Sequence, residues 1–176
     1  AGDGIGKEAA LTYARYGATV ILLGKTVNKL TAVYDEIVAN GGQEPAIVPL
    51  DLKGATAKHY RDMAATIDAE FGRLDGVLHN AGILGVLSPL LKRMAAASVV
   101  FTSSGVGRKG RAFWGPYAVS KFATEGLMQV MADEFENSSI RVNCINPGAT
   151  RTKMRSKAYP GEDVSKLKTA ADLMWL

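Results

Sequence analysis

Cysteine is nearly absent from this sequence, since Cys144 is the only one. A single cysteine excludes an intrachain disulfide, and a lone cysteine inside an apolar strand is more often a small core residue than a nucleophile. No uninterrupted apolar run reaches the roughly 18 residues of a membrane span, and the chain opens on glycines without a basic and apolar leader. These absences favour a cytoplasmic protein with no membrane partner.

Basic residues are in slight excess, giving a net charge of +4, but they are scattered along the chain. The densest cluster, Arg108, Lys109 and Arg111, lies in a glycine-containing stretch that reads as a solvated loop. A nucleic-acid-binding domain would gather its charge on one face, so we expect no nucleic-acid partner. Phosphate groups of a cofactor would account for the excess equally well.

Short apolar runs rich in β-branched residues alternate with longer stretches of helical spacing, which predicts an α/β fold with a mostly parallel sheet. With 176 residues, 47% of them hydrophobic, a single domain over residues 1–176 is expected. The expected strands are 18–23, 45–50, 76–79, 98–102 and 140–145. The expected helices are 6–16, 27–40, 56–71 and 117–136.

Two features predict that the chain is incomplete. A doubly wound sheet begins with a strand that feeds the glycine loop, yet this sequence starts inside that loop at Ala1. The helical part of the crossover before strand 98–102 would be about 13 Å long, short for retracing a strand of roughly 17–20 Å. We therefore expect segments of a longer chain that lack the first strand, part of this crossover and the last strand; an intact mass near 18.7 kDa would contradict this.

Glycines gather where the first helix is expected to begin, in the run Ala-Gly-Asp-Gly-Ile-Gly. Gly2, Gly4 and Gly6 would let the backbone approach a pyrophosphate, at which the free N–H groups of the helix terminus point. Simple turn formation gives the same pattern, so this signal is weak by itself.

Lys25 follows the strand 18–23, where the adenosine ribose binds in a doubly wound sheet. An acidic residue there would bond the ribose 2′-hydroxyl, whereas a basic one would pair with the 2′-phosphate of NADP(H). Lys25 therefore favours NADP(H) over NAD(H), with an ordinary exposed loop lysine as the alternative. Asp3, in the glycine loop, weighs mildly against additional phosphate charge.

Tyr117 and Lys121 stand four residues apart on an expected helix, so their side chains share one face. A free tyrosine has a pKa of about 10, and a nearby ammonium stabilises the phenolate and lowers it. The pair is therefore a candidate acid/base unit, although this spacing also arises by chance on solvated helices. Ser104 lies just after the strand 98–102, at the sheet edge where doubly wound folds bind ligands, or else only closes a turn ahead of glycine.

These residues resemble the smaller, single-domain members of the short-chain dehydrogenase/reductase family, over nearly the whole chain. The matching segments, in order, are Ala1 to Gly6, Asp51-Leu52, Asn80-Ala81-Gly82, Ser103-Ser104, the run from Tyr117 to Lys121, and Asn146-Pro147-Gly148 with Thr152. His79 stands where the family usually has the first Asn of its Asn-Asn-Ala-Gly motif. A closer resemblance, to one bacterial subgroup of oxidoreductases, rests on the Gly-Asp-Gly-Ile-Gly, Leu-His-Asn-Ala-Gly and Val-Phe-Thr-Ser-Ser runs.

The resemblance implies a Rossmann-type doubly wound sheet and hydride transfer between a nicotinamide and an alcohol or carbonyl substrate. Ser104 would orient the substrate oxygen, Tyr117 would exchange the proton, and Lys121 would lower the tyrosine pKa while bonding the nicotinamide ribose. The cofactor-binding residues would be Gly2, Gly4, Ile5, Gly6, Lys25, Asp51, Leu52, Asn80, Ala81, Gly82, Tyr117, Lys121, Pro147, Gly148 and Thr152. No metal ligand is expected.

One departure from the family is the further catalytic Asn, because no Asn occurs from Gly82 to Glu136. The short crossover favours its lying in a missing segment, and a truly deleted helix would put activity in doubt. A dinucleotide-binding regulator or scaffold on the same fold is the alternative function, against which the retention of Ser104, Tyr117 and Lys121 argues.

Substrate choice would come from the loop around Arg111 to Gly115, including Trp114, and from residues 153–168, a polar stretch that reads as a mobile lid. The apolar residues of the helix 117–136 cover too wide a face for one core. Part of that face is expected to pack against another subunit in a homodimer or homotetramer.

Overall fold

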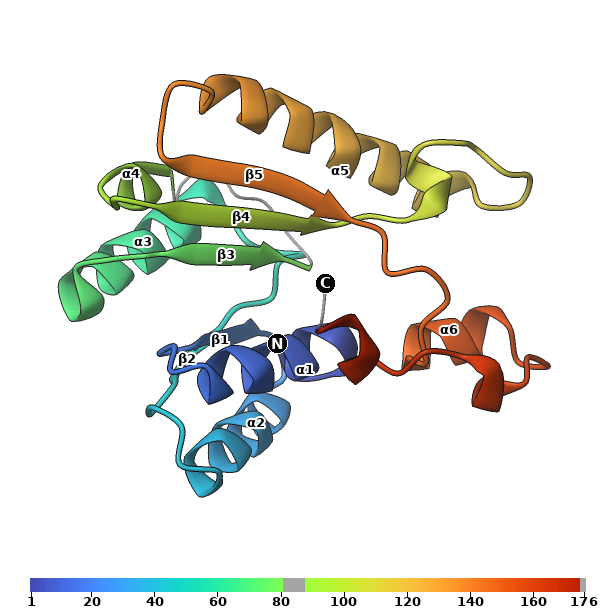
Figure 1. Cartoon of the computed structure of the whole chain (residues 1–176), viewed down its shortest axis with the longest axis horizontal. Coiled ribbons are helices and arrows are strands. Elements are labelled where there is room, and N and C mark those ends of the chain that lie inside the picture. Colours follow the sequence, from blue (N-terminus) through green and yellow to red (C-terminus); the bar gives the residue numbers. More distant parts are fainter. Residues whose placement is uncertain (81–87, 175–176) are drawn as a thin grey trace. The chain divides into compact units, whose positions relative to one another are not determined.

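The structure, a computed structural model, describes residues 1–80 and 88–174. Every strand pair in these residues is parallel, and helices flank the strands (Figure 1), which confirms the predicted α/β class. The chain divides into two compact units: Ala1–Ala55 with Ala149–Leu176, and Thr56–Gly148. A single domain over the whole chain stays a prediction. Within the described residues, no helix combines the length and the apolar character needed to cross a membrane.

The first unit is built on two parallel strands, β1 (Ile21–Gly24) and β2 (Ala46–Pro49), with Ile21 opposite Ala46. Two helices, α1 (Gly4–Arg15) and α2 (Val27–Ala39), pack with them around a core of Ala10, Ala14, Leu22, Leu30, Val33 and Ile37. The helix α1 begins two residues before the predicted start because the Asp3 carboxylate accepts a hydrogen bond from the Gly4 N–H at 2.9 Å.

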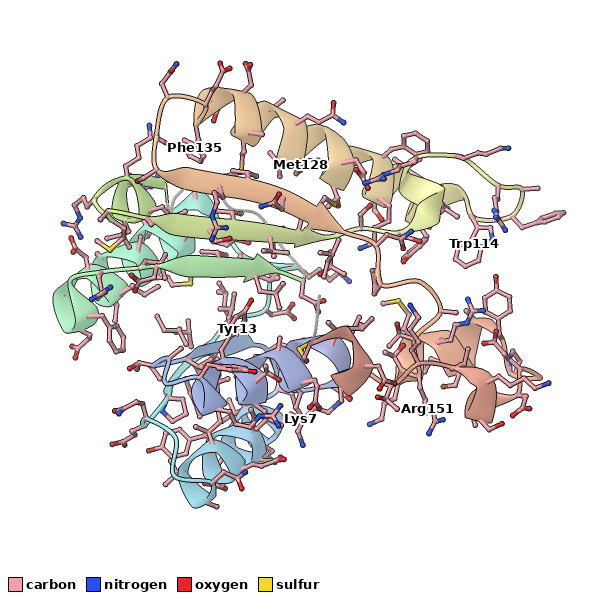
Figure 2. The ribbon with its side chains drawn as sticks, viewed as in Figure 1. Lys7, Tyr13, Trp114, Met128, Phe135 and Arg151 are labelled. Carbon is pink, nitrogen blue, oxygen red and sulfur yellow. The ribbon has the colours of Figure 1, made fainter. Side chains whose placement is uncertain are left out.

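The C-terminal part of the first unit contains α6 (Lys153–Ala158), η2 (Val164–Lys166) and η3 (Ala171–Leu173). The Arg151 N–H donates to the Lys168 carbonyl at 2.7 Å, and its guanidinium donates to the Val164 carbonyl at 3.0 Å. Arg151 lies on the segment that enters α6 (Figure 2). The polar stretch expected as a lid forms short helical turns joined by hydrogen bonds of its own, and its mobility stays a prediction.

The second unit contains a three-stranded parallel sheet in the order β3-β4-β5, formed by β3 (Gly76–His79), β4 (Ala97–Thr102) and β5 (Ile140–Ile145). The long helix α5 (Gly115–Glu134) and the short α4 (Ser88–Lys92) cover the same face, where the Lys92 ammonium lies 5.3 Å from the centroid of the Phe135 ring. The helix α3 (Ala57–Phe71) lies next to α4, to which the ion pair between Asp68 and Arg93 connects it. A short 3-10 helix, η1 (Gly105–Gly107), connects β4 toward α5. At five residues, α4 agrees with the predicted shortness of the crossover.

The core of the second unit lies largely between α5 and the sheet. Its buried members are Leu91, Ala97, Val99, Phe101, Met131, Phe135 and Ile140. Met128 packs against them, and Phe135 follows the last turn of α5 (Figure 2). Burying one such aromatic or aliphatic side chain stabilises the fold by about 1.5–3 kcal/mol, so this layer fixes α5 against the face of the sheet.

Candidate functional site

Two positions of the glycine loop in the first unit, Gly2 and Gly4, require glycine. Gly4 has a φ of +55°, in the left-handed region that favours glycine. A Cβ built on Gly2 would lie 2.7 Å from the Lys29 Cβ, closer than such atoms come. The loop is therefore seated directly against the first turn of α2.

Asp3 joins this loop to two lysines. Its Oδ2 lies 2.8 Å from the Lys29 ammonium and 3.3 Å from the Lys153 ammonium. The hydrogen bond from Lys29, followed by that from Lys153, lowers the pKa of Asp3 to about 2. The carboxylate is thus neutralised locally, which weakens the argument from the sequence that Asp3 opposes phosphate. Sequence reasoning missed both lysines, because no local spacing connects residues 3, 29 and 153.

A hollow of about 290 Å³ opens beside the glycine loop within the first unit. Asp3, Gly4, Thr152, Lys153 and Arg155 are among the residues that line it. The Thr152 methyl group is 3.6 Å from where a Gly4 Cβ would lie, so the structure brings these two predicted cofactor residues together. The Thr152 hydroxyl also caps α6 by accepting a hydrogen bond from the Arg155 N–H at 3.2 Å.

One wall of the hollow is stiffened by Arg155, whose guanidinium forms two hydrogen bonds with the Glu162 carboxylate, at 2.5 and 2.7 Å. The same guanidinium stacks over the Tyr159 ring, 3.8 Å from its centroid. The hydrogen bond from Arg155 holds the pKa of Glu162 below its ordinary value. A planar guanidinium fixed on both sides gives this wall a defined shape.

The remaining predicted residues of the first unit lie where the sequence placed them. Ile5 and Gly6 are in the first turn of α1, and Lys25 is exposed directly after β1. Asp51 follows β2 and accepts a hydrogen bond from the Lys53 N–H at 3.1 Å, beside a half-buried Leu52. Because β1 and β2 are parallel neighbours, Lys25 and Asp51 belong to one edge of the pair.

In the second unit, Lys121 lies on α5, one helical turn after Tyr117 and on the same face. Its ammonium donates a hydrogen bond to the Thr102 carbonyl at 2.9 Å and lies 5.6 Å from the centroid of the Tyr117 ring. Burial lowers the pKa of Lys121. The Trp114 ring packs on Tyr117 at a centroid distance of 5.4 Å, from the loop before α5 (Figure 2). Trp114 is half-buried.

Ser104 lies at the carboxyl end of β4, as predicted, and precedes η1. Its carbonyl accepts a hydrogen bond from the Gly107 N–H at 2.8 Å, while the Ser103 N–H donates to Ile145 at 2.8 Å and extends the pairing of β4 with β5. The serine segment is therefore a continuation of the sheet followed by one tight turn.

Three further predicted residues follow strands of the same sheet. Asn80 follows β3 and is exposed. Pro147 and Gly148 follow β5, where Gly148 has a φ of +70° and donates its N–H to the Asn146 side chain at 3.1 Å. These residues share the carboxyl edge of the sheet with Ser104. Ala81 and Gly82 lie outside the described residues.

Sequence reasoning also missed a layer of polar groups between α5 and the sheet. Glu125 on α5 is buried, and its spacing of four from Lys121 was a signal that could have found it. His79 on β3 stacks on Phe101 with centroids 4.8 Å apart, and its buried Nε2 has no hydrogen-bond partner among the residues that the structure describes. Burial, with a smaller effect of Lys121, lowers the pKa of His79 to about 4. Over the described ranges, no three His, Cys, Asp or Glu side chains gather as a metal site.

Comparison with known proteins places the chain in a family. The short chain dehydrogenase family matches residues 1–89 and 84–163. The chain belongs to this family and is an oxidoreductase. It is 51% identical to the uncharacterized oxidoreductase YciK of Escherichia coli K12, an alignment that covers 99% of this chain and 80% of the relative. YciK represents the bacterial subgroup that the sequence runs resemble.

Solved structures agree in fold with the Rossmann-type architecture. A short chain dehydrogenase of Shigella flexneri 2a complexed with NADP superposes with a TM-score of 0.94 at 50% identity, covering 98% of this chain and 84% of that one. A second, from Escherichia coli CFT073 complexed with NADPH, has a TM-score of 0.93 at 50% identity, covering 99% and 86%. The alignment with YciK spans 203 positions against 176 residues, so the relative carries internal residues without a counterpart here.

Proposed function

We propose that the chain is an NADP(H)-preferring dehydrogenase or reductase that interconverts an alcohol and a carbonyl group. The observation that carries this proposal is the position of Lys121, whose ammonium is fixed by the Thr102 carbonyl beside the ring of Tyr117. Ser104 follows the strand that supplies this carbonyl. The carboxyl edge of the sheet thus carries the Ser104 hydroxyl, and α5 carries the Tyr117 phenol and the Lys121 ammonium.

The residues of the first unit fit a dinucleotide. The positive φ of Gly4 and the close packing of Gly2 on Lys29 hold the loop at the start of α1, and a helix N-terminus is a favourable place for phosphate oxygens. Gly2, Gly4, Ile5 and Gly6 would hold the phosphates, Thr152 would hold the nicotinamide end, and the exposed Lys25 would pair with a 2′-phosphate. Two similar structures contain NADP or NADPH, which supports this preference. When bound, the nicotinamide supplies or accepts the hydride.

Each catalytic side chain then has one task. The Ser104 hydroxyl donates a hydrogen bond to the substrate oxygen and orients it. The Tyr117 hydroxyl gives its proton to that oxygen during reduction and takes it back during oxidation. The Lys121 ammonium, oriented by Thr102 beside the Tyr117 ring, would bond the nicotinamide ribose, as the family resemblance implies. Asp51, Leu52, Asn80, Ala81, Gly82, Pro147 and Gly148 are assigned to the cofactor by the family resemblance.

Cofactor binding is the first test. Titration with NADPH and NADH should show tighter binding of NADPH, because Lys25 adds an ion pair with the 2′-phosphate. The variant Lys25→Asp should weaken NADPH binding about tenfold or more and leave NADH within about threefold. Lys58→Asp, at an exposed lysine of α3, serves as the charge-matched control. No binding of either cofactor would refute the proposal.

Catalysis separates an enzyme from a dinucleotide-binding scaffold. Reduction of cyclohexanone and 4-nitrobenzaldehyde by NADPH would be followed at 340 nm. Tyr117→Phe removes the proton donor, so its kcat should fall about 10²–10⁴-fold while NADPH still binds. If wild type and Tyr117→Phe reduced the probes at equal rates, Tyr117 would not be the proton donor, and the alternative of a dinucleotide-binding scaffold would be favoured.

We also propose a cytoplasmic location and a homodimeric or homotetrameric state. The single cysteine supports the first. The second is supported by apolar side chains exposed along α5, among them Val119 and Val130 at 69% and 55% exposure. Nucleic acid and membrane are not proposed as partners.

A further inference from the structure

Glu125 is a buried carboxylate that the proposed chemistry does not use. Only 6% of the residue is exposed, and it lies one helical turn beyond Lys121 on the same face of α5. Burying a carboxylate is costly unless charged or hydrogen-bonding groups compensate it. Its neighbours therefore indicate what the carboxylate holds.

The neighbours of Glu125 come from two other segments, residues 103–108 and the strand β5. The Arg108 Nε donates to its Oε1 at 3.2 Å. The Ser103 hydroxyl and the Cys144 thiol also face the carboxylate, although the Ser103 hydroxyl lacks a hydrogen bond of regular geometry. Burial alone would raise the pKa of Glu125, but Ser103 and then Arg108 outweigh it, and the net shift is downward. The carboxylate is thus ionised at neutral pH.

Ser103 and Arg108 are the two ends of the segment that contains Ser104. Between them, Gly107 is packed so tightly that an added Cβ would lie 2.9 Å from the Lys121 carbonyl and 2.9 Å from the Ser103 hydroxyl. The segment has no apolar anchor other than Val106, which is buried. The position of Ser104 therefore depends on the contacts at the two ends and on the close approach to α5.

We propose that Glu125 is a positioning residue, which fixes Ser104 by holding both ends of the segment 103–108 against α5. It acts through Ser103 and Arg108 and touches no substrate. This inference rests on the proposed function only where it concerns catalysis. The anchoring itself concerns contacts within the second unit and is independent of it.

The catalytic test uses the purified protein with NADPH and 4-nitrobenzaldehyde. Glu125→Leu should lower kcat about 10–100-fold, because a displacement of about 1 Å at a catalytic group has this effect. NADPH affinity should stay within about twofold. Glu125→Gln keeps an acceptor for Ser103 and Arg108 and should recover kcat to within about threefold of wild type. Glu134→Gln, at an exposed residue of the same helix, is the matched control.

A double-mutant cycle separates anchoring from general damage. Arg108→Leu alters a side chain that is 65% exposed, so the variant should fold even where Glu125→Leu does not. It should lower kcat about tenfold, and the double variant Arg108→Leu/Glu125→Leu should be about as slow as Glu125→Leu alone, because both act through one segment. Additive losses, or a parallel loss of NADPH binding and melting temperature, would overturn the proposal.

Hydrogen exchange measures the anchor without catalysis. The amides of residues 104–108 should exchange about tenfold faster in Glu125→Leu than in wild type, with the strands unchanged. Unchanged exchange at these amides would overturn the proposal. If wild type is inactive with both carbonyl probes, the proposed function fails while the exchange result still decides whether Glu125 anchors the segment.

Discussion

The ammonium of Lys153 lies 3.3 Å from Oδ2 of Asp3, so the first residue of α6 is tied to the glycine loop. Lys29, from α2, shares the same oxygen at 2.8 Å. One carboxylate thus gathers the start of three helices around the place where phosphate is proposed to bind. This arrangement predicts how the loop responds to the loss of a single charge.

Replacing Asp3 by Asn should tighten NADPH binding. Asn is as good a helix N-cap as Asp, so α1 should still begin at Gly4. The change removes a negative charge and releases two ammonium groups to the cofactor. Isothermal titration at low ionic strength should show a Kd about 3–10-fold lower, and the gain should shrink with added salt. Asp35→Asn, at an exposed position of α2, should leave the Kd unchanged.

A methyl group on Gly2 should damage the cofactor site. Because it would meet the Lys29 Cβ at 2.7 Å, Gly2→Ala should push the loop from α2 and destabilise the protein by about 1–3 kcal/mol. NADPH binding should weaken as well. Gly54→Ala is the control, since no atom lies within 4 Å of its added Cβ. Urea unfolding and NADPH titration measure the two effects, and equal behaviour of both variants would contradict the prediction.

His79 predicts a pH dependence of stability. Its pKa is lowered from 6.5 to about 4 in the folded protein, mainly by burial, so the unfolded chain takes up this proton first as pH falls. The neutral His79 therefore makes its full contribution to the free energy of unfolding above pH 6.5. This contribution, on the order of 2 kcal/mol after allowance for solvent screening, is lost as the pH falls from 6.5 to about 4. His79→Phe keeps the ring against Phe101 and should flatten this part of the stability curve.

The wild-type protein provides the comparison. Chemical unfolding at a series of pH values supplies the curves. A His79→Phe protein as sensitive to pH as wild type would show that the ring is not held neutral in the fold.

The exposed face of α5 predicts self-association. Sedimentation of the wild-type protein at micromolar concentration should show a dimer or tetramer. Val130→Lys places a charge on this face and should shift the protein toward monomer, whereas Val38→Lys, at a similarly exposed valine of α2, should not. A monomeric wild type would refute the assignment of this face.

The secondary structure could be predicted from the sequence because periodicity is a local property. The strands β3 and β5 begin and end at the predicted residues, since each is a short run bounded on both sides by polar residues. The start of α5 lies two residues before the prediction, because Pro116 is favoured in a first helical turn. The order of the sheet follows from the same alternation of strands and helices.

The partners of the site residues could not be predicted in this way. Lys29 and Lys153 meet Asp3 only after the chain folds, and no spacing in the sequence connects them. The proximity of Thr152 to Gly4 was implied by the family resemblance alone. The position of Glu125 on the same helix face as Lys121 could have been predicted from their spacing. Its burial could not, because it depends on how α5 packs on the sheet.

The hydrogen bond from Lys121 ends on the main chain of Thr102. Every amino acid has this carbonyl, so no substitution at position 102 deletes the acceptor. Substitutions along β4 therefore leave the orientation of the Lys121 ammonium unchanged, as long as the strand keeps its register with β3 and β5. Side chains of the strand are free to adapt to different cores while the charge beside Tyr117 stays in place.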